Sequence, residues 1–274
     1  MMSLKSKALL VKAVDDPIPG IPRPGPYQRY RYPRLEIVTR RMKVVQPGHV
    51  RLKVILAGVC GTDIHLLESN KSTGYVNCSA PASIPRKGRI LGHECVGQII
   101  EVGEAVTGLQ PGDIVACESI ISCGVCIPCR QGAFNQCSRA RLLGMEEDGI
   151  FATYADLPQR ICHPIEGLEQ KPQGLVQAAC LEPAAVAYVA FEYARVQSAE
   201  HVLIFGGGPI GLFLAMLAKC IFGSLWVELI EPLKLRRELA NRWADQVFTP
   251  RQFWARKTAA LPYYDAVFEA SGEL

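Results

Sequence analysis

Apolar and polar residues alternate in short runs over the first part of the chain. Residues 50–57 alternate and then become fully apolar, which is typical of a strand that enters a core. Residues 98–103 and 109–115 form two further short runs, joined by glycine and Pro-Gly turns. This pattern predicts a β-barrel as the first domain, over residues 1–183.

After residue 178 the apolar segments are longer, and strands alternate with helices. Residues 178–194 are rich in alanine and predict a helix that crosses into a second domain, residues 184–274. Residues 201–205 predict a buried strand, 212–220 a helix and 225–230 another strand. The expected fold class is therefore α/β plus β, a β-barrel followed by a partial doubly wound domain.

Composition and charge exclude several classes of function. One uncharged apolar run, residues 202–218, is at the short limit for a membrane span, and its four glycines and Pro209 are grouped as in a loop. The net charge of +4, from 30 basic and 26 acidic residues, is too balanced to indicate nucleic acid or a membrane surface as partner. Eleven cysteines, and no start that resembles a signal peptide, indicate a reducing, cytoplasmic setting.

Two polar segments interrupt the predicted strands. Residues 17–34 contain six prolines interleaved with arginines and tyrosines. Proline at this density excludes helix and favours an extended, solvated loop over a surface that binds nucleic acid or another anionic partner. Residues 69–89 form a second loop, which we expect to border the mouth of a site.

A first group of reactive side chains follows the strand predicted at residues 50–57. Cys60 offers a thiolate, Thr62 a small hydroxyl, and His65 an imidazole that titrates near neutral pH. A strand end can hold such groups rigidly. The alternative interpretation of this segment is a buried thiol beside a surface turn.

A second group stands further along the chain, where His93 and Glu94 lie in an apolar context. Charged side chains are rarely buried unless they are paired or bound to a metal. Cys60, His93 and one further ligand, with a fourth position open, have the pattern of a catalytic zinc.

The most specific metal motif lies within residues 117–140 and has the spacing C-x2-C-x2-C-x7-C, formed by Cys123, Cys126, Cys129 and Cys137. Gaps of two residues let successive thiolates converge on one ion in a closed tetrahedral site. Such a site holds a loop together and does no chemistry. An iron–sulfur cluster uses the same ligand type.

A nucleotide motif, G-x-G-x-x-G, joins the strand at residues 201–205 to the helix that follows. Gly206 permits a tight turn, Gly208 lets the backbone approach a pyrophosphate, and Gly211 lets the helix pack on the strand. Between the last two glycines, Pro209 and Ile210 begin the helix N-terminus, whose amide groups can bind phosphate.

An acidic residue, Glu231, follows the next predicted strand. It can accept both hydroxyls of a ribose and would repel a 2′-phosphate, which favours NAD over NADP. Arg236 and Arg237 lie in the next helix, and NADP remains possible if both guanidinium groups point at the ribose.

Together these motifs resemble the zinc-dependent medium-chain alcohol and polyol dehydrogenases, from about Leu35 to the last residue. The resemblance implies a chaperonin-10-like (GroES-like) barrel, NAD as cofactor and two zinc ions per chain, with a structural zinc rather than an iron–sulfur cluster on the four cysteines. Glu182 is followed by proline, as in polyol and threonine dehydrogenases, whereas other alcohol dehydrogenases carry cysteine there. The third ligand of the catalytic zinc is therefore expected to be Glu94 or Glu182.

The resemblance also implies a reaction. A secondary alcohol or polyol would lose its proton through Thr62 and the cofactor ribose to His65, and its hydride to the nicotinamide. Asp63 would hold the ring of His93. Two alternatives remain: a zinc-free quinone reductase, against which the cysteines argue, and a catalytically inactive relative that binds zinc and nucleotide.

The last predicted strand, residues 264–270, resembles the fourth strand of a doubly wound domain. Compared with a complete domain of that kind, on the order of 70–100 residues would be missing. We therefore expect weak turnover or none, an uncovered sheet edge that promotes aggregation, and the absence of the strand through which family members usually form homo-oligomers.

Overall fold

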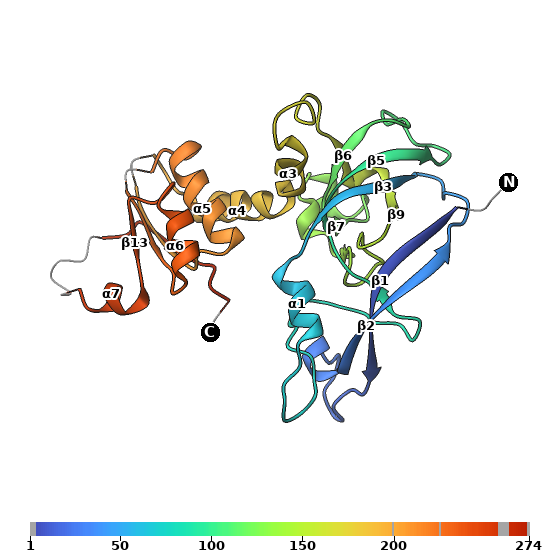
Figure 1. Cartoon of the computed structure of the whole chain (residues 1–274), viewed down its shortest axis with the longest axis horizontal. Coiled ribbons are helices and arrows are strands. Elements are labelled where there is room, and N and C mark those ends of the chain that lie inside the picture. The colour runs from blue at the N-terminus through green and yellow to red at the C-terminus, as the bar shows by residue number, and fades with distance from the viewer. Residues whose placement is uncertain (1–3, 199, 225, 257–262, 273–274) are drawn as a thin grey trace. The chain divides into compact units, whose positions relative to one another are not determined.

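The computed structural model describes residues 4–198, 200–224, 226–256 and 263–272. The chain forms two compact units, Met1–Glu182 and Pro183–Leu274 (Figure 1). Antiparallel strands dominate the first unit, and the second is a parallel sheet with helices.

The strands of the first unit form two larger sheets and a small one. Their orders are β2-β1-β4, β10-β6-β5-β3-β9 and β7-β8. The strand bounds are β1 (Lys5–Asp15), β2 (Tyr30–Arg41), β3 (His49–Gly58), β4 (Arg89–Ile90), β5 (Glu94–Val102), β6 (Ile114–Cys117), β7 (Ile120–Ile121), β8 (Arg141–Leu142), β9 (Tyr154–Pro158) and β10 (Cys162–Pro164). The helices are η1 (Pro26–Gln28), α1 (Gly61–Leu67), α2 (Ile127–Arg130), η2 (Phe134–Gln136), η3 (Gln159–Ile161) and α3 (Gly174–Ala179).

Alternation along β3 explains the core of this unit. Val50 and Leu52 are fully buried and pack against Ile99 of β5 and Leu157 of β9, because alternate side chains of a strand point to the same face. The β-rich first domain predicted from the sequence is confirmed.

Two local predictions for this unit differ from the structure. The loop predicted over residues 17–34 ends earlier than expected, because strand β2 begins at Tyr30 and pairs with β1 from that residue on. Pro33 is tolerated since β2 is an edge strand, where a missing amide breaks no ladder. Residues 61–67, for which the sequence pattern predicts no helix, form helix α1, which is too short to show a helical period in the sequence.

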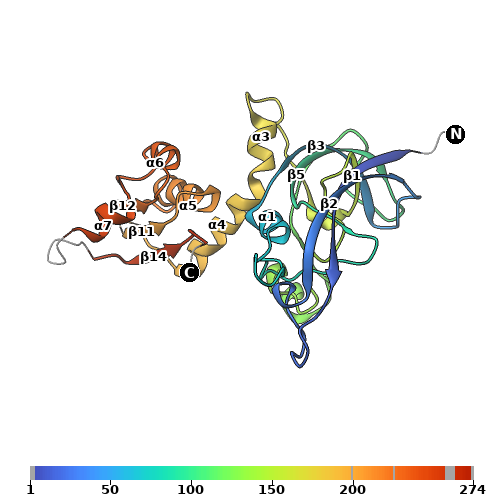
Figure 2. The same ribbon diagram turned by 60° about the horizontal axis from the view of Figure 1, so that its bottom comes forward.

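The second unit is a four-stranded parallel sheet of order β13-β12-β11-β14 (Figure 2). Its strands are β11 (His201–Phe205), β12 (Trp226–Ile230), β13 (Gln246–Phe248) and β14 (Ala266–Glu269), and its helices are α4 (Leu181–Ala194), α5 (Pro209–Cys220), α6 (Lys234–Ala240) and α7 (Pro250–Trp254). The strand order reverses at β11, the position at which doubly wound sheets bind ligands. The predicted α/β second domain is confirmed, although Leu225, the first residue of the expected second strand, lies outside the described residues.

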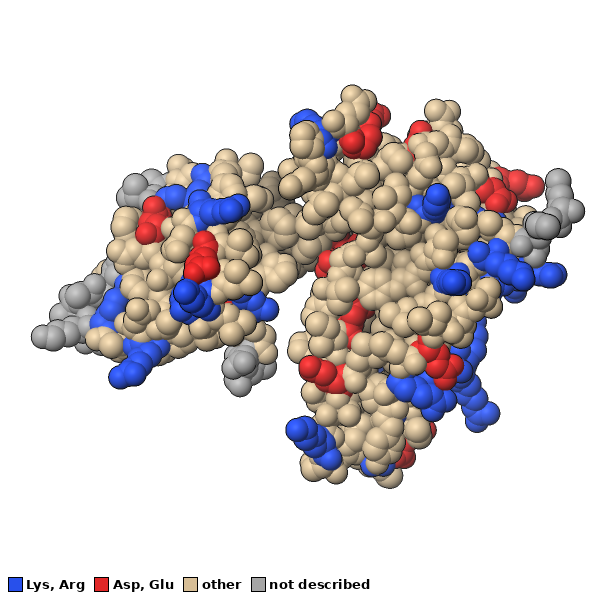
Figure 3. Space-filling view, viewed as in Figure 1, with Lys and Arg blue, Asp and Glu red and all other residues tan. Residues whose placement is uncertain are grey.

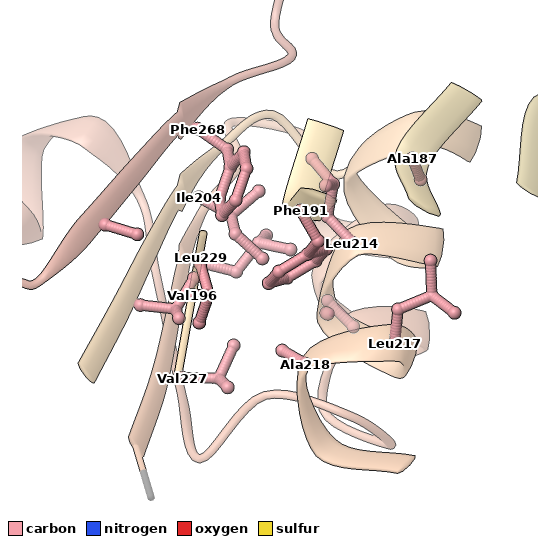
Figure 4. Close-up of a cluster of buried hydrophobic side chains, with 14 residues drawn as sticks. Ala187, Phe191, Val196, Ile204, Leu214, Leu217, Ala218, Val227, Leu229 and Phe268 are labelled. Carbon is pink, nitrogen blue, oxygen red and sulfur yellow. The ribbon is translucent and has the colours of Figure 1, made fainter. Parts of the chain in front are cut away.

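Helices α4 and α5 cover one face of this sheet with an apolar layer (Figure 4). Phe191 of α4 is fully buried, stacks on Phe222 with ring centroids 4.5 Å apart, and lies 4.6 Å from the Phe268 ring. Ile204 and Leu214 bury their side chains in the same layer. The predicted helix over 178–194 is divided at Cys180, between α3 and α4.

The apolar run 202–218 consists of strand β11, the glycine-rich turn and most of α5. Among the residues that the structure describes, no helix has the length and apolar character needed to cross a membrane. Basic and acidic side chains are interspersed over the face shown in Figure 3.

Candidate functional site

The first metal-type cluster consists of Cys60, His93 and Glu94, whose ligand atoms all lie within 4.8 Å of one another. Cys60 lies between the end of β3 and the start of α1, and Glu94 is the first residue of β5. Strands β3 and β5 are antiparallel neighbours, and Gly58 is paired with Glu94. Strand pairing thus brings together a thiol, an imidazole and a carboxyl group, three ligand types that zinc accepts.

The charges of this cluster call for a cation. Burial alone would lower the pKa of His93, but a hydrogen bond with Cys60 and the negative charges of Asp63 and Glu182 raise it to about 9. Burial raises the pKa of Glu94, and the charge of Glu182 raises it further. A divalent metal ion would favour the neutral imidazole and the ionised carboxylate, so the donor set fits zinc.

Glu182 lies in the first turn of α4. Within the described part of the chain, it is not among the residues whose ligand atoms lie within 4.8 Å of one another. Its charge nevertheless acts on both His93 and Glu94. In this geometry Glu94 is the nearer candidate for a third ligand, and Glu182 is a carboxylate beside the cluster.

Asp63 does not hold the His93 ring, contrary to the expectation from the sequence. Its Oδ1 atom is 4.0 Å from His93 Nδ1, beyond hydrogen-bond distance, and Nδ1 is buried with no hydrogen-bond partner in the described structure. Asp63 instead accepts the backbone N–H groups of Cys60 and Gly92, each at 3.1 Å. The buried carboxylate therefore fixes the backbone beside two candidate ligands.

Thr62 and His65 lie on α1, one turn apart. Thr62 Oγ1 is buried, and the structure shows no hydrogen-bond partner for it among the described residues. His65 is about half exposed, and its Nδ1 lies 3.6 Å from Glu68 Oε2. A buried hydroxyl without a partner can bind a polar group of a ligand, and an exposed imidazole can exchange protons with water.

The second cluster contains the four cysteines of the lobe at residues 117–140, and their sulfur atoms all lie within 4.8 Å of one another. Cys126 Sγ is 3.4 Å from Cys129 Sγ and 3.8 Å from Cys137 Sγ, and Cys123 Sγ is 4.0 Å from Cys129 Sγ. Four sulfurs at the usual zinc distance form a tetrahedron with edges of about 3.8 Å. The four thiols therefore fit a closed tetrahedral zinc site.

Backbone amides of the same loop point at these sulfurs. The N–H of Cys123 donates to Cys137 Sγ at 3.2 Å, and the N–H of Cys126 donates to Cys123 Sγ at 3.4 Å. Hydrogen bonds from the amides of Val125 and Cys126 lower the pKa of Cys123 to about 5, and burial raises that of Cys129 to about 11. The amides of the loop thus stabilise negative charge on Cys123, whereas burial favours the protonated thiol at Cys129.

Three other buried cysteines contribute to packing. Cys95, Cys117 and Cys162 lie in the core of the first unit, and Cys117 is the cross-strand partner of Cys162. Hydrogen bonds with Cys162 and Cys95, together with burial, raise the pKa of Cys117, which keeps this thiol protonated and unreactive.

In the second unit the glycine-rich turn connects β11 to α5. Gly206 has φ +95°, and a Cβ atom there would lie 2.5 Å from the carbonyl oxygen of Ala270. A Cβ atom on Gly211 would lie 1.9 Å from the carbonyl oxygen of Gly206. At Gly208, by contrast, the one atom of the described residues beyond its chain neighbours that lies within 4 Å of a Cβ position is Arg236 Nη1, at 3.9 Å. The helix begins at Pro209, so the space over Gly208 faces free helical amides.

Glu231 is 2% exposed and its two carboxylate oxygens accept the backbone N–H groups of Gly207 and Leu233, each at 2.7 Å. Arg236 Nη1 lies 3.9 Å from Glu231 Oε2. Arg237 instead donates to the carbonyl oxygen of Glu231 at 3.0 Å, and thus supports the turn before α6. Only one of the two arginines therefore faces the space beside Glu231.

Sequence reasoning missed residues whose roles depend on tertiary contacts. Gly58 lies against Glu94 across two strands, and Gly207 donates to Glu231, whereas neither glycine forms part of a spacing rule. Arg139 contacts the cysteine lobe but follows the motif rather than lying within it. Its position two residues after Cys137 is the only signal in the sequence.

Comparisons with known proteins agree with this geometry. The alcohol dehydrogenase GroES-like domain family matches residues 46–167. L-threonine 3-dehydrogenase of Pyrococcus abyssi is 36% identical over 207 residues, which are 74% of this chain and 55% of that protein. D-xylulose reductase A of Aspergillus oryzae is 34% identical over 212 residues, 77% of this chain and 56% of that protein.

A solved structure extends the similarity to both units. The short chain alcohol dehydrogenase of Escherichia coli CFT073, solved with NADH, superposes with a TM-score of 0.77 at 26% identity, covering 98% of this chain and 70% of that chain. The present chain spans about half the length of the curated relatives that it matches.

Proposed function

We propose that this chain, which belongs to the zinc-dependent medium-chain alcohol and polyol dehydrogenase family, transfers hydride between a secondary alcohol or polyol-type substrate and NAD. The observation that carries the proposal is the cluster of Cys60, His93 and Glu94 in the same chain as a glycine-rich turn closed by Glu231. A mixed sulfur, nitrogen and oxygen set with three protein ligands is the catalytic rather than the structural type of zinc site.

Three residues would hold the catalytic zinc, namely Cys60, His93 and Glu94. A zinc ion bound there would supply Lewis acidity to a substrate hydroxyl. Glu182 adds negative charge beside the cluster and is the alternative third ligand. Asp63 keeps the two ligand-bearing segments in register through the N–H groups of Cys60 and Gly92.

Two residues of α1 would handle the proton. The buried hydroxyl of Thr62 has an unused hydrogen-bonding capacity and can accept a proton from a substrate hydroxyl while it donates its own. His65 is exposed enough to release a proton to water. The two residues lie one helical turn apart on α1, and in this proposal a cofactor ribose would complete the relay between them.

The turn from Gly206 to Gly211 would bind the pyrophosphate of NAD, and helix α5 begins within this turn with Pro209 and Ile210. Glu231 would bind the ribose. NAD accepts the hydride in such enzymes. Each carboxylate oxygen of Glu231 holds one backbone N–H and keeps capacity for one ribose hydroxyl. A 2′-phosphate would approach this buried negative charge, and among the described residues Arg236 pairs with Glu231 and could offset it.

The experiment is a binding and turnover assay on the purified 274-residue chain. Zinc content and NADH affinity are measured first, and NAD reduction is then followed with secondary alcohols, pentitols and L-threonine. We expect zinc and NADH to bind, and turnover, where it occurs, to be abolished by Cys60→Ala. A chain that binds neither zinc nor NADH, or whose turnover survives Cys60→Ala, would refute the proposal.

A further inference from the structure

We propose that residues 144–151 position the candidate zinc ligand His93, and that Gly149 is the positioning residue at their closest contact. The inference rests on the proposed function, because it concerns how firmly the set of Cys60, His93 and Glu94 holds its metal. It assigns a role to a segment that lies outside this ligand set.

Three consecutive amides of this segment bind the three carbonyl groups that precede His93. The N–H groups of Gly149, Ile150 and Phe151 donate to the carbonyl oxygens of Ile90, Gly92 and Leu91, at 2.8, 3.1 and 2.8 Å, respectively. These bonds join two stretches of backbone that are distant in the sequence. The segment therefore holds the backbone of residues 90–92 up to the ligand itself.

Gly149 brings the two stretches closer than any other residue type would allow. It is buried, and a Cβ atom there would lie 2.2 Å from the carbonyl oxygen of Gly92 and 2.5 Å from that of Leu91. Non-bonded atoms in contact are about 3.5–4.0 Å apart, so a methyl group would displace backbone. Gly149 is not among the glycines with a positive φ, so space rather than backbone conformation requires a glycine here.

The carbonyl group of Gly92 transmits such a displacement to His93. Its oxygen belongs to the planar peptide group that joins the two residues, so a shift of this oxygen moves or rotates the group from which the His93 side chain extends. The N–H of Gly92 donates to Asp63 Oδ1 at 3.1 Å, and its Cβ position lies 2.4 Å from the ring of Phe151. Gly92 is thus held on its other sides and has little freedom to absorb the shift.

The position of His93 matters because the other ligands belong to other segments. Cys60 lies just before α1, and the ligand atoms of the set lie within 4.8 Å of one another. A metal site needs its ligands within about 0.5 Å of the productive geometry. We expect Gly149→Ala to weaken zinc binding at this set about tenfold, the lower end of the range seen when a group that supports a ligand is lost.

Two neighbouring substitutions separate this role from a general loss of stability. Ile150 is fully buried in the apolar core of the same unit, and Ile150→Val removes a methylene group from that core but keeps the N–H that binds Gly92. Gly61→Ala adds a methyl group beside the same site, where the nearest atom, His65 Nε2, is 3.9 Å from the Cβ position. Both variants should keep the zinc affinity of the parent, although Ile150→Val should lower the melting temperature.

The test measures zinc binding to the purified chain by competition with a chelator. The Cys60→Ala chain, which keeps only the ion of the cysteine lobe, gives the baseline. Gly149→Ala should raise the dissociation constant of the Cys60-dependent ion about tenfold and leave the ion of the lobe in place. With cobalt in place of the Cys60-dependent ion, the absorption bands of Gly149→Ala should shift, because they report the geometry of the ligands.

An unchanged dissociation constant and cobalt spectrum in Gly149→Ala would overturn the inference, as would an equal loss of affinity in Ile150→Val. If Gly149→Ala does not fold, Phe151→Leu, which loosens the packing against Gly92, decides the question. Weaker zinc binding by that variant supports the inference, and binding equal to that of the parent overturns it. A parent chain with no Cys60-dependent zinc overturns the proposed function and the inference with it, a result distinct from an unchanged affinity.

Discussion

Gly58 and Glu94 face each other across β3 and β5, and a Cβ atom on residue 58 would lie 2.2 Å from Glu94 Oε2. The Glu94 carboxylate therefore occupies the volume that any other residue at position 58 would fill. The glycine is what allows this carboxylate to lie beside Cys60 and His93.

Substitution of Gly58 by alanine should displace the Glu94 carboxylate from the cluster while the strands stay paired. We expect the affinity for the catalytic zinc to fall by about 10–100-fold, the range seen when a group that supports a metal site is lost. Zinc titration with a competing chelator measures it. Gly61→Ala is the control, because the nearest atom to its Cβ position is His65 Nε2 at 3.9 Å. Normal zinc affinity in Gly58→Ala would exclude Glu94 as a ligand and favour Glu182.

Asp63→Asn should weaken the same site by another route. The carboxylate now accepts hydrogen bonds from the N–H groups of Cys60 and Gly92, each at 3.1 Å. The side-chain oxygen of an asparagine could accept only one of them, and its NH2 group would face the other donor. Leaving a buried donor unsatisfied costs about 1–3 kcal/mol, which we expect in the free energy of unfolding together with weaker zinc binding. Chemical denaturation measures the first. Glu68→Gln, an exposed change near the end of the same helix, should leave both quantities unchanged.

Metal analysis should give two zinc ions per chain, because two separate ligand sets are present. Cys60→Ala should remove one ion and leave the chain folded, since Cys60 is not part of the hydrophobic core of either unit. Cys129→Ala should remove the other and lower the melting temperature, because structural zinc contributes folding free energy. A native ratio near one, or iron in place of zinc, contradicts this prediction.

NAD should bind more tightly than NADP, since Glu231 is buried and already oriented by two amides. Glu231→Gln removes the charge that repels a 2′-phosphate and one strong acceptor for the ribose. The preference for NAD should then shrink about tenfold, the value of a hydrogen bond to a charged group. Dissociation constants for both cofactors measure it, with Arg236→Ala expected to shift the preference the opposite way. Tighter binding of NADP by the unmodified chain would show that Arg236 outweighs the carboxylate.

The buried carboxylate of Glu228 should make the stability of the second unit depend on pH. Burial raises its pKa, but hydrogen bonds from Arg256, Tyr264 and Trp226 outweigh burial and hold the pKa below the usual 4.5. A depressed folded-state pKa contributes stability above the unfolded value, and this stability is lost as the pH falls through the folded value. Glu228→Gln should cost about 3 kcal/mol near neutral pH, because it removes the buried charge that pairs with the partly exposed Arg256, and less below pH 4.

The exposed residue Glu238, which lies 3.8 Å from Lys234, provides the control for that change. Glu238→Gln should alter the free energy of unfolding by less than about 0.5 kcal/mol. An equal effect of the two substitutions, or a Glu228→Gln cost that does not depend on pH, would show that Glu228 does not act through its charge.

Features that depend on neighbouring residues could be predicted from the sequence. The alternation of β3, the spacing of the cysteines from Cys123 to Cys137 and the turn from Gly206 to Gly211 are each encoded within about fifteen residues, and the structure contains all three. Local pattern also correctly placed β14 beside the other strands of the parallel sheet.

Features that depend on pairing distant segments could not be predicted in this way. The choice between Glu94 and Glu182 depends on the register of β3 and β5, and no local pattern fixes that register. Asp63 was expected to contact His93, but its carboxylate is closer to two backbone amides, which carry no signature in a sequence. Helix α1 was missed because seven residues hold fewer than two helical periods.

The two ligand sets differ in how much of the chain must be ordered before a metal can bind. Cys123 and Cys137 close a loop of fifteen residues, so all four sulfurs are available as soon as this segment has been synthesised, and closing so short a loop costs little entropy. Cys60 and His93 meet only after β3 has paired with β5, a non-local step. The lobe can therefore bind its ion while the rest of the chain is unfolded, whereas Cys60 and His93 form their site only once β3 and β5 have paired.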